Sequence, residues 1–245
     1  MPRSNSPELD LFERGVLVRL TQVDAGYRSG DVLRGIEFEV NRSEVALVTG
    51  PAAAGKTTLI HLLRLALQPT AGRAVILGAD ARRLNMTWRA RLKRHIGYVA
   101  ENPSFIENWS AYENIALPLK LMGRKPAEYA PDVQELVEFV GLNADAGTLA
   151  SQLSGAQRRR AAIARALAGK PDLILADDPT AGMSPADGKR IVRLLAEMRR
   201  VGAAIVITSQ DQGLAEVAPT TSWRLERGRL TPVSAVEDAE DYEAT

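Results

Sequence analysis

A glycine-bounded loop followed by a lysine and two threonines has the composition of a phosphate-binding site. Residues 50–58 fit the pattern G-x-x-x-x-G-K-[ST]; the apolar run 45–49 before them predicts a buried strand, and the stretch 59–67 after them predicts a helix. In this order the glycines let backbone N–H groups wrap an anion, and the helix start adds unpaired N–H groups and a positive dipole end. The loop is therefore predicted to bind a nucleotide, and a tight connection without a ligand is the alternative.

Two side chains of the loop have defined chemistry in this interpretation. The Lys56 ammonium would reach the β- and γ-phosphates, and the Thr57 hydroxyl would ligate Mg²⁺. The cofactors expected are ATP and Mg²⁺. The expected nucleotide contacts along the loop are Gly50, Pro51, Ala52, Ala53, Ala54, Gly55, Lys56, Thr57 and Thr58.

Two neighbouring carboxylates follow another buried strand. The apolar run 173–176 leads into Asp177 and Asp178, at the carboxyl end of a strand, where open α/β sheets bind ligands. Phosphate-loop enzymes need one carboxylate that holds Mg²⁺ and one group that positions the attacking water. Asp177 fits the metal role and Asp178 the catalytic role. A simple turn is the alternative, since Asp-Asp-Pro favours one.

The elements that must position these residues predict an α/β fold. Alternating apolar and polar residues at 16–24 and 32–40 favour an antiparallel strand pair. The stretch from 101 to about 169 is helical in character and interrupts the alternation of strands and helices. We expect a P-loop NTPase core with an antiparallel β subdomain and an inserted α-helical subdomain. The remaining expected elements are strands at 73–77, 96–99, 204–208, 222–225 and 229–233, and helices at 84–94, 111–122, 131–140, 158–167 and 185–200.

The bulk composition restricts the class of protein. The chain has 245 residues, of which 45% are hydrophobic, and this suits one domain that we place at 16–233. Residues 1–15 are expected to be a polar extension, and residues 234–245, with five carboxylates and no basic residue, an acidic disordered tail. The absence of cysteine excludes disulfides and thiolate chemistry.

Charge and hydropathy predict where the protein acts. The 31 Lys and Arg residues balance 30 Asp and Glu residues, so no nucleic-acid partner is expected. The basic residues of the helix at 84–94 are expected to form a solvent-exposed helix face. No signal peptide is expected, and no apolar stretch is long enough to cross a bilayer, so no direct membrane insertion is expected either. We expect a cytoplasmic protein that reaches the inner face of the cell membrane through a partner.

The order of motifs resembles the nucleotide-binding domain of ABC ATPases. It is carried by the loop 50–58, the run Leu-Ser-Gly-Ala-Gln at 153–157 and the segment 173–180, and it extends over roughly 16–233. Within that superfamily the chain is similar to the cell-division ATPases of the FtsE type, judged from segments 49–51, 112–119 and 160–167. Lipoprotein-releasing and macrolide-export ATPases share much of this pattern.

The resemblance implies a two-chain site. Two copies would pack head to tail as a homodimer around two ATP molecules, each bound by the loop of one chain and by Ser154, Gly155 and Gln157 of the other. Tyr27 would stack on adenine, although an ordinary edge-strand aromatic is the alternative. Glu101 would stand near Mg²⁺ and the attacking water. The helical subdomain would receive an integral membrane protein, of the FtsX type in the cell-division case.

Several positions depart from the family pattern, and most of them concern hydrolysis. The resemblance expects glutamine at Glu101, glycine at Ala156, glutamate at Asp178 and a switch histidine at Ser209, or at Gln210 with a slip of one residue. It also expects aspartate at Ser184 and commonly glycine at Ala53. The catalytic candidates are accordingly Asp178, Ser209 and Glu101, and the metal candidates are Thr57, Glu101 and Asp177.

The altered residues predict weakened hydrolysis. The shorter side chain of Asp178 pulls its carboxylate back by roughly 1.5 Å, and a misplacement of about 1 Å can cost about a hundredfold in rate. Ser209 cannot span the distance that an imidazole does. The predicted function is therefore an ATP-binding subunit that dimerises on Mg·ATP and acts with a membrane partner in cell division. A non-hydrolysing, nucleotide-gated clamp and the ATPase of a lipoprotein-releasing or macrolide-export transporter remain alternatives.

Overall fold

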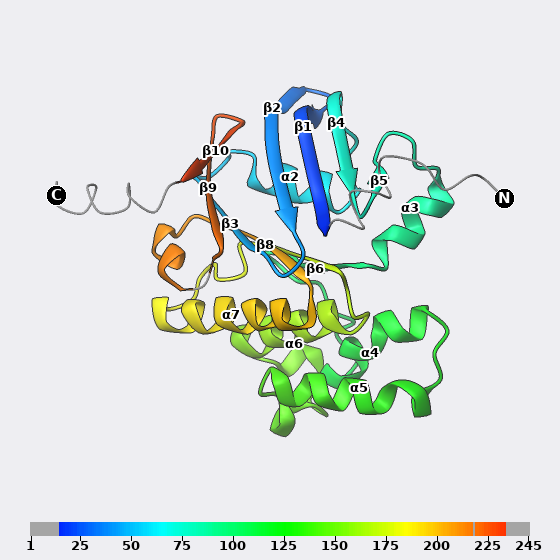
Figure 1. The fold of residues 1–245 in the computed structure, drawn as a ribbon. Coiled ribbons are helices and arrows are strands. Elements are labelled where there is room, and N and C mark those ends of the chain that lie inside the picture. Colours follow the sequence, from blue (N-terminus) through cyan, green and yellow to red (C-terminus); the bar gives the residue numbers. More distant parts are fainter. Residues whose placement is uncertain (1–14, 218, 234–245) are drawn as a thin grey trace.

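The chain folds around a six-stranded sheet that is mostly parallel. The computed structural model describes residues 15–217 and 219–233 (Figure 1). The strand order is β10-β9-β3-β8-β7-β6, in which β3, β8, β7, β6 and β9 are parallel neighbours and only β10 is antiparallel. The strands are β3 (Val45–Thr49), β6 (Ile96–Val99), β7 (Leu173–Asp177), β8 (Ala204–Ser209), β9 (Thr221–Glu226) and β10 (Arg229–Val233).

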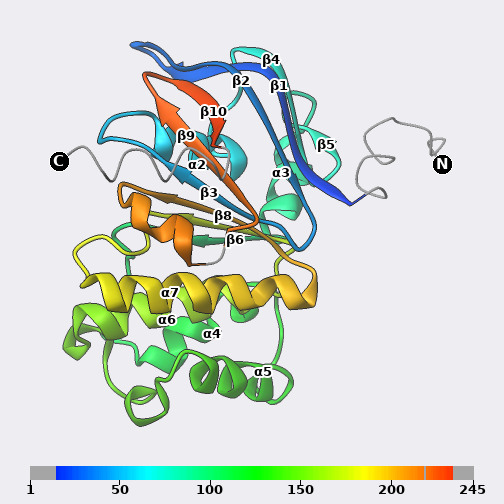
Figure 2. The ribbon, with the colours of Figure 1, turned by 60° about the vertical axis from the view of Figure 1, so that its left-hand side comes forward.

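A second, antiparallel sheet lies above one face of the first. Its strand order is β2-β1-β4-β5, and helix α2 lies between the two sheets (Figures 1 and 2). The pairing of β1 with β2 confirms the predicted antiparallel pair, and both strands extend beyond the predicted ends. The elements are β1 (Val16–Tyr27), β2 (Gly30–Asn41), β4 (Ala71–Ile76), the unpredicted β5 (Ala79–Asp80) and α2 (Lys56–Leu63).

Helices cover the opposite face of the six-stranded sheet. They are α4 (Ala111–Leu121), α5 (Pro126–Phe139), α6 (Gly155–Leu167) and α7 (Pro185–Glu197), with short 3-10 turns η1 (Asn143–Asp145), η2 (Ala150–Gln152), η3 (Met198–Val201) and η4 (Gln212–Glu216). Helix α3 (Met86–Lys93) stands apart at the side of the antiparallel sheet (Figure 1). The predicted fold class, an α/β core with an antiparallel sheet and a helical layer, is confirmed. No helix in the described ranges is long and apolar enough to cross a membrane.

Two hydrophobic cores explain why the central strands are apolar throughout. On β3, Val45 and Leu47 belong to the core shared with α4 to α7, whereas Ala46 and Val48 belong to the core shared with α2 and the antiparallel sheet. Side chains alternate between the faces of a strand, and a strand buried on both faces needs apolar residues at every position. This double burial holds the carboxyl ends of β3, β7 and β8 together at one edge.

Several helix ends differ from the prediction, and three of them have a clear local reason. Helix α2 ends at Leu63 and not at 67, because Leu65 has a left-handed φ of 58°. Helix α5 begins at Pro126 and not at 131, since a proline costs nothing in the first turn, where its missing N–H would have no partner. Helix α6 begins at Gly155 and not at 158, because Ser154 caps it. The predicted N-terminal extension and acidic tail fall almost wholly outside the described residues.

Candidate nucleotide-binding site

The loop between β3 and α2 is shaped for an anion by its two glycines. Gly50 has no room for a side chain, since an added Cβ would lie 2.2 Å from the Leu225 carbonyl oxygen on β9. Gly55 has a φ of 110°, which turns the chain into the first helical residue, Lys56. The predicted order of strand, loop and helix is therefore present, and the amino end of α2 faces the space above the loop.

Lys56 is poised over this loop. Only 8% of the residue is exposed, and its Nζ donates hydrogen bonds to the carbonyl oxygens of Gly50 at 2.6 Å and Pro51 at 2.8 Å. Burial lowers the pKa of the Lys56 ammonium, and the negative charges of Asp178, Asp177 and Glu101 partly oppose this shift. The ammonium therefore lies near three carboxylates, and a bound phosphate would add further negative charge around it.

Asp177 and Asp178 end the buried strand β7 next to Thr208 on β8. The Thr208 hydroxyl donates to Asp177 Oδ1 at 2.9 Å, and the Asp178 amide donates to the Thr208 carbonyl oxygen at 3.0 Å. Thr208 is fully buried. It was not among the predicted site residues, although its place at the end of an apolar strand run is a signal that could have indicated it.

The Asp178 carboxylate accepts hydrogen bonds from two side chains at the carboxyl end of strand β8. Its Oδ1 accepts from the Ser209 hydroxyl at 3.4 Å, and its Oδ2 accepts from the Gln210 side-chain amide at 3.3 Å. Asp178 also has a left-handed φ of 42°, which is uncommon for a residue with a side chain. Both candidates for the switch position therefore contact the predicted catalytic carboxylate, Ser209 from a fully buried position and Gln210 from an exposed one.

One cleft of about 310 Å³ collects most of the predicted residues. The set of donors fits Mg·ATP, because hydroxyl and carboxylate oxygens are hard ligands for Mg²⁺ and the ammonium and loop N–H groups suit phosphate. Ser209 lines the adjoining cleft on the other side of Asp178. The first cleft is lined by Val32, Ala52, Ala53, Gly55, Lys56, Thr57, Thr58, Glu101, Asp177, Asp178 and Gln210.

Tyr27 lies beside this cleft and does not line it. It is 49% exposed at the end of β1, and its hydroxyl pairs with His61 Nδ1 of α2 at 3.0 Å. An exposed ring held next to the helix that follows the loop is available for stacking. Its assignment to adenine stays a prediction.

Ser154, Gly155 and Gln157 lie on a different surface. Ser154 caps α6: its hydroxyl accepts from the Gln157 amide at 3.3 Å, and Gln157 Oε1 accepts from the Ser154 amide at 2.7 Å. Gly155 faces open space and lines a second cleft, of about 480 Å³. Glu101 lines both clefts. One chain therefore presents the loop and the α6 start at two separate edges, which we call the two binding edges because the resemblance implies nucleotide contacts at both.

Arg159 connects these two edges and was missed in the sequence. It is 9% exposed and sits one turn into α6, where its guanidinium donates to the carbonyl oxygens of Ala100, Glu101 and Ala181. Burial lowers the pKa of Arg159, while the charges of Asp178 and Glu101 raise it. A basic residue directly after a helix start gives little sequence signal, since most such residues are solvated.

Ser184, where the resemblance expects aspartate, acts as a helix cap. Its hydroxyl accepts from the Asp187 amide at 3.2 Å and donates to Asp187 Oδ2 at 2.8 Å, at the start of α7. Serine is a favoured cap residue. Its local hydrogen bonds are therefore those of an ordinary helix start.

Known proteins resemble this chain in sequence and in fold. The ABC transporter family matches residues 33–181. The methionine import ATP-binding protein MetN of Cupriavidus necator is 36% identical over 214 residues, and the match spans 86% of this chain and 62% of that protein. The lipoprotein-releasing system ATP-binding protein LolD of Shewanella sp. (strain MR-7) is 32% identical over 206 residues, 82% of this chain and 89% of that protein.

A solved structure supports the same relation. The ATP-binding cassette MJ0796, in a dimeric post-hydrolysis state bound to ADP and Pi, superposes with a TM-score of 0.80 at 27% identity. The superposition covers 89% of this chain and 99% of that one. The similarity therefore includes the whole cassette.

Proposed function

This chain belongs to the ABC transporter family of ATPases, and we propose that it is the ATP-binding subunit of a membrane complex, in which two copies close on Mg·ATP and cleave it slowly. ATP with Mg²⁺ is the cofactor of this family. The proposal assigns the loop 50–58, Asp177 and Asp178 to one half of each site, and Ser154, Gly155 and Gln157 of the second copy to the other half.

The binding groups support ATP as the ligand. When bound, Mg·ATP supplies the electrophilic γ-phosphate and the charge that balances Lys56. The Lys56 ammonium would exchange its carbonyl partners for phosphate oxygens, and the Thr57 hydroxyl and Asp177 carboxylate would hold Mg²⁺. The Thr208 hydroxyl orients the Asp177 carboxylate through its 2.9 Å hydrogen bond to Oδ1. The other carboxylate oxygen, Oδ2, would then ligate Mg²⁺.

Slow cleavage rests on the position of Asp178. Its short carboxylate is occupied on both oxygens by Ser209 and Gln210, at 3.4 and 3.3 Å. A water-positioning group must reach the γ-phosphate side of the site, and a misplacement of about 1 Å can cost about a hundredfold in rate. This pair of contacts is the observation that carries the proposal of weak hydrolysis.

A transport ATPase is the favoured complex. The match covers 62% of the methionine import protein MetN and 89% of the lipoprotein-releasing protein LolD, and both of these relatives are named for transport. The membrane partner would hold the chain at the inner face of the cell membrane. A cell-division role with an FtsX-type partner rests on the sequence resemblance of 49–51, 112–119 and 160–167 alone, because the relatives described above carry transport names.

A nucleotide-gated clamp is the second candidate. If Asp178 cannot activate water at all, ATP binding would close the dimer and signal to the partner without turnover. The same two hydrogen bonds on Asp178 favour this candidate. It differs from the first only in the rate of phosphate release.

Steady-state phosphate release decides between these candidates. We expect the purified chain to bind ATP but to release phosphate far more slowly than the double variant Asp178→Glu/Ser209→His. Glutamate adds one methylene, and histidine restores a long hydrogen-bonding side chain. Each single variant serves as a control, and ATP affinity is measured alongside.

Two outcomes count against the proposal. Ordinary turnover by the unmodified chain, without a membrane partner, would show that Asp178 is already well placed. An unchanged rate of phosphate release in the double variant, with ATP still bound, would show that Asp178 and Ser209 do not limit hydrolysis.

Co-purification of the membrane partner would then distinguish a transport permease from a cell-division protein.

A further inference from the structure

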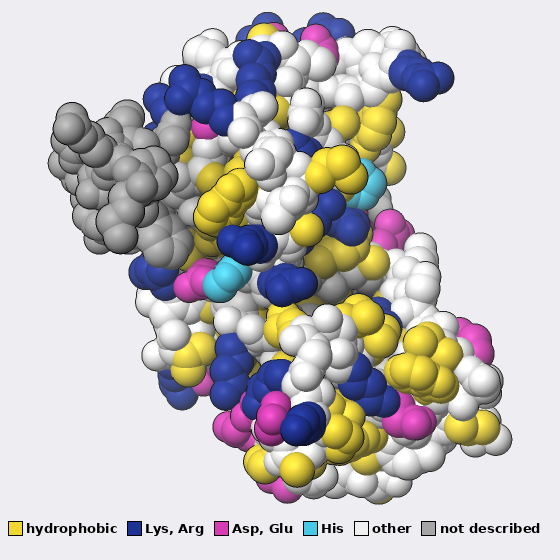
Figure 3. Space-filling view, turned by 90° about the vertical axis from the view of Figure 1, so that its right-hand side faces the viewer, with side chains coloured by type: hydrophobic (Ala, Val, Ile, Leu, Met, Phe, Trp, Pro, Cys, Tyr) yellow, Lys and Arg dark blue, Asp and Glu magenta, His cyan; other side chains and the backbone are white. Residues whose placement is uncertain are grey.

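Helix α3 and the turn before it form a concentrated basic surface. Residues 81–100 contain six Lys and Arg residues and no Asp or Glu, although the whole chain is nearly neutral. Figure 3 looks onto this side of the molecule and shows Lys and Arg side chains interspersed with exposed hydrophobic ones. We call these residues the α3 patch: Arg82, Arg83, Arg89, Arg91, Lys93 and Arg94.

Most contacts within the α3 patch orient its cations without neutralising them. Arg89 donates to the carbonyl oxygens of Leu65 and Ala81, at 3.4 and 3.2 Å, and Arg82 likewise bonds backbone carbonyls. Arg83 forms an ion pair with Asp80, with 3.8 Å between Nε and Oδ2. The same Oδ2 atom of Asp80 also pairs with Arg73 Nε, at 3.6 Å. Carbonyl oxygens hold a guanidinium in place but carry no net charge. The printed carbonyl contacts of Arg82 and Arg89 therefore leave the positive charge of these two guanidiniums in place.

The surroundings of Lys93 agree with an excess of positive charge at this surface. Burial lowers the pKa of Lys93, and the nearby guanidiniums of Arg64 and Arg89 lower it further. The charges that act on this ammonium are thus of its own sign. A binding partner that brings negative charge would relieve the repulsion.

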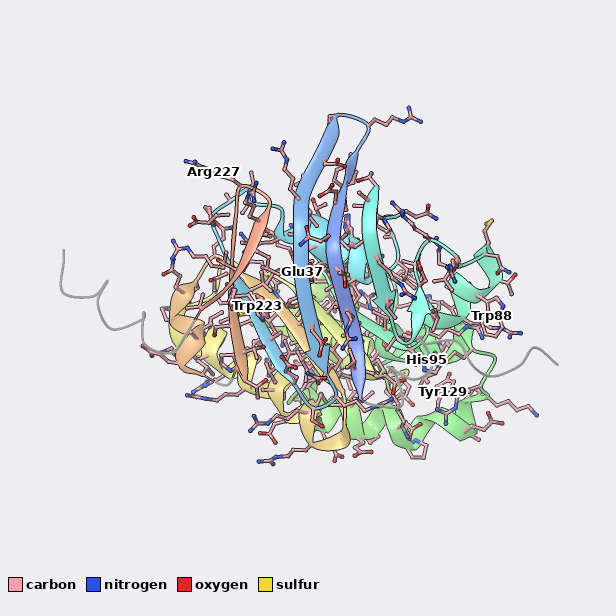
Figure 4. The ribbon with its side chains drawn as sticks, turned by 45° about the horizontal axis from the view of Figure 1, so that its top comes forward. Glu37, Trp88, His95, Tyr129, Trp223 and Arg227 are labelled. Carbon is pink, nitrogen blue, oxygen red and sulfur yellow. The ribbon has the colours of Figure 1, made fainter. Side chains whose placement is uncertain are left out.

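Exposed apolar side chains accompany the cations on the same short helix. Met86 is 88% exposed and Trp88 is 55% exposed, and α3 buries none of its residues. The Arg91 guanidinium lies over the Trp88 ring, 5.1 Å from its centroid. Figure 4 shows Trp88 at the outer edge of the molecule. An indole next to cations suits the interface between lipid headgroups and acyl chains, where one end is apolar and the other wet.

We propose that the α3 patch is a docking surface for anionic phospholipid headgroups. The chemistry is electrostatic attraction by the arginines and lysine, with shallow burial of Met86 and Trp88 at headgroup depth. An acidic protein segment would match the charge, but no residue of the α3 patch lines the clefts at the loop and at α6, and the exposed side chains of Met86 and Trp88 favour a lipid surface. The contact would orient the cassette at the membrane in addition to its protein partner.

This proposal requires neither ATP binding nor hydrolysis, so its test is separate from that of the proposed function. The full-length chain, without nucleotide, is sedimented with vesicles of phosphatidylcholine and with vesicles that also contain phosphatidylglycerol. We expect pelleting only with the anionic vesicles and release by added salt. Each cation near an anionic surface changes the partition by about fivefold, so the double variant Arg91→Ala/Arg94→Ala should bind about twenty-five-fold less.

A matched variant removes the same charge elsewhere. Arg193 and Arg199 are exposed on α7 and η3, and Arg193→Ala/Arg199→Ala should pellet like the unmodified chain. Quenching of tryptophan fluorescence by brominated phosphatidylglycerol should be weaker in Trp88→Phe than in the unmodified chain. Folding of each variant is checked by circular dichroism.

Three results would overturn the proposal. Equal pelleting with neutral and anionic vesicles would remove the electrostatic basis. An equal loss of binding in the α7 control would make the effect one of net charge. Binding of soluble polyglutamate through Arg91 and Arg94, together with no binding to anionic vesicles, would assign the surface to an acidic protein partner.

Discussion

Two residues of the site hold backbone conformations that their side chains disfavour. Ala53 in the phosphate loop has a φ of 61°, and Asp178 at the end of β7 has a φ of 42°. The left-handed conformation costs a residue with a Cβ about 1–2 kcal/mol, and aspartate tolerates it better than alanine does. Ala53 lies between Gly50, which packs against the Leu225 carbonyl oxygen, and Gly55, which turns the chain into α2. Ala53 is thus a point of strain at the phosphate-binding edge.

Replacing Ala53 with glycine should stabilise the protein. The Ala53→Gly variant relieves the disfavoured φ but gains freedom in the unfolded chain, and we expect a net rise of about 0.5–1 kcal/mol in the free energy of unfolding. Urea unfolding followed by circular dichroism measures it, with ATP affinity as a second readout.

The adjacent Ala52 provides the control for this change. It is also exposed in the loop but is not among the residues with positive φ, so Ala52→Gly should lower the stability. Equal effects at both positions would contradict the explanation by strain.

At the scale of elements, α6 links the two binding edges of the chain. Its first turn presents Ser154 and Gly155, and its second presents the Arg159 guanidinium to the carbonyls of Ala100, Glu101 and Ala181. One rigid planar group with five N–H donors can hold three carbonyl oxygens of two other chain segments in a fixed geometry, which a flexible lysine or a glutamine does not provide. Arg159 is therefore a positioning residue for the Glu101 side of the cleft.

Removal of this guanidinium should affect turnover more than ATP binding. In Arg159→Gln the buried carbonyls lose donors, and we expect the free energy of unfolding to fall by about 1–3 kcal/mol. Phosphate release should slow while the Kd for ATP stays within a few-fold, because Arg159 does not line the P-loop cleft. Arg159→Lys should recover only part of the rate.

Arg160 offers a neighbouring comparison. It is only partly buried, and its guanidinium donates to the Gly141 carbonyl oxygen at 2.9 Å. Arg160→Gln should leave turnover nearly unchanged. An equal loss of turnover in both variants would assign the effect to the general stability of α6.

At the scale of the whole molecule, the two binding edges cannot meet within one chain. The cleft at the loop 50–58 and the cleft at the start of α6 share Glu101 but are otherwise lined by different residues. Ser154 is not among the residues that line the cleft at the loop. A complete site of the proposed kind therefore needs a second copy. The similar cassette MJ0796 has a dimeric structure bound to ADP and Pi.

A mixture of two defective variants should recover function. Lys56→Ala disables the loop, and Gly155→Asp places a negative charge at the α6 start, where an added Cβ meets nothing within 4 Å and the fold is undisturbed. A mixed dimer contains one site with both intact halves. We expect labelled ATP to be retained on gel filtration by the mixture and lost by either variant alone.

The outcome separates one-chain from two-chain sites. Retention of ATP by Gly155→Asp alone would show that the α6 edge is not needed. No retention in the mixture, with both variants folded, would contradict a site shared between copies.

Much of the site was accessible from the sequence because its signals are local. The loop 50–58 lies between an apolar strand and a helix in one continuous segment, and Asp177 and Asp178 directly follow an apolar run. The residue types and spacing within such a continuous segment are enough to predict its local structure. The extended strand pair and the helical stretch were predicted for the same reason. The end of α2 was predicted wrongly, because the left-handed φ of Leu65 has no signal in the sequence pattern.

The sequence by itself determined the phosphate loop, the carboxylate pair and the α/β class, because each depends on neighbouring residues and on the period of the apolar pattern. Only the tertiary structure decided that Thr208 contacts Asp177, that Ser209 and Gln210 contact Asp178, and that Arg159 holds the backbone of Glu101, which lines both clefts. These contacts join residues about 20 to 60 positions apart in the chain. They depend on which strands lie side by side, and the packing of the whole sheet sets that order.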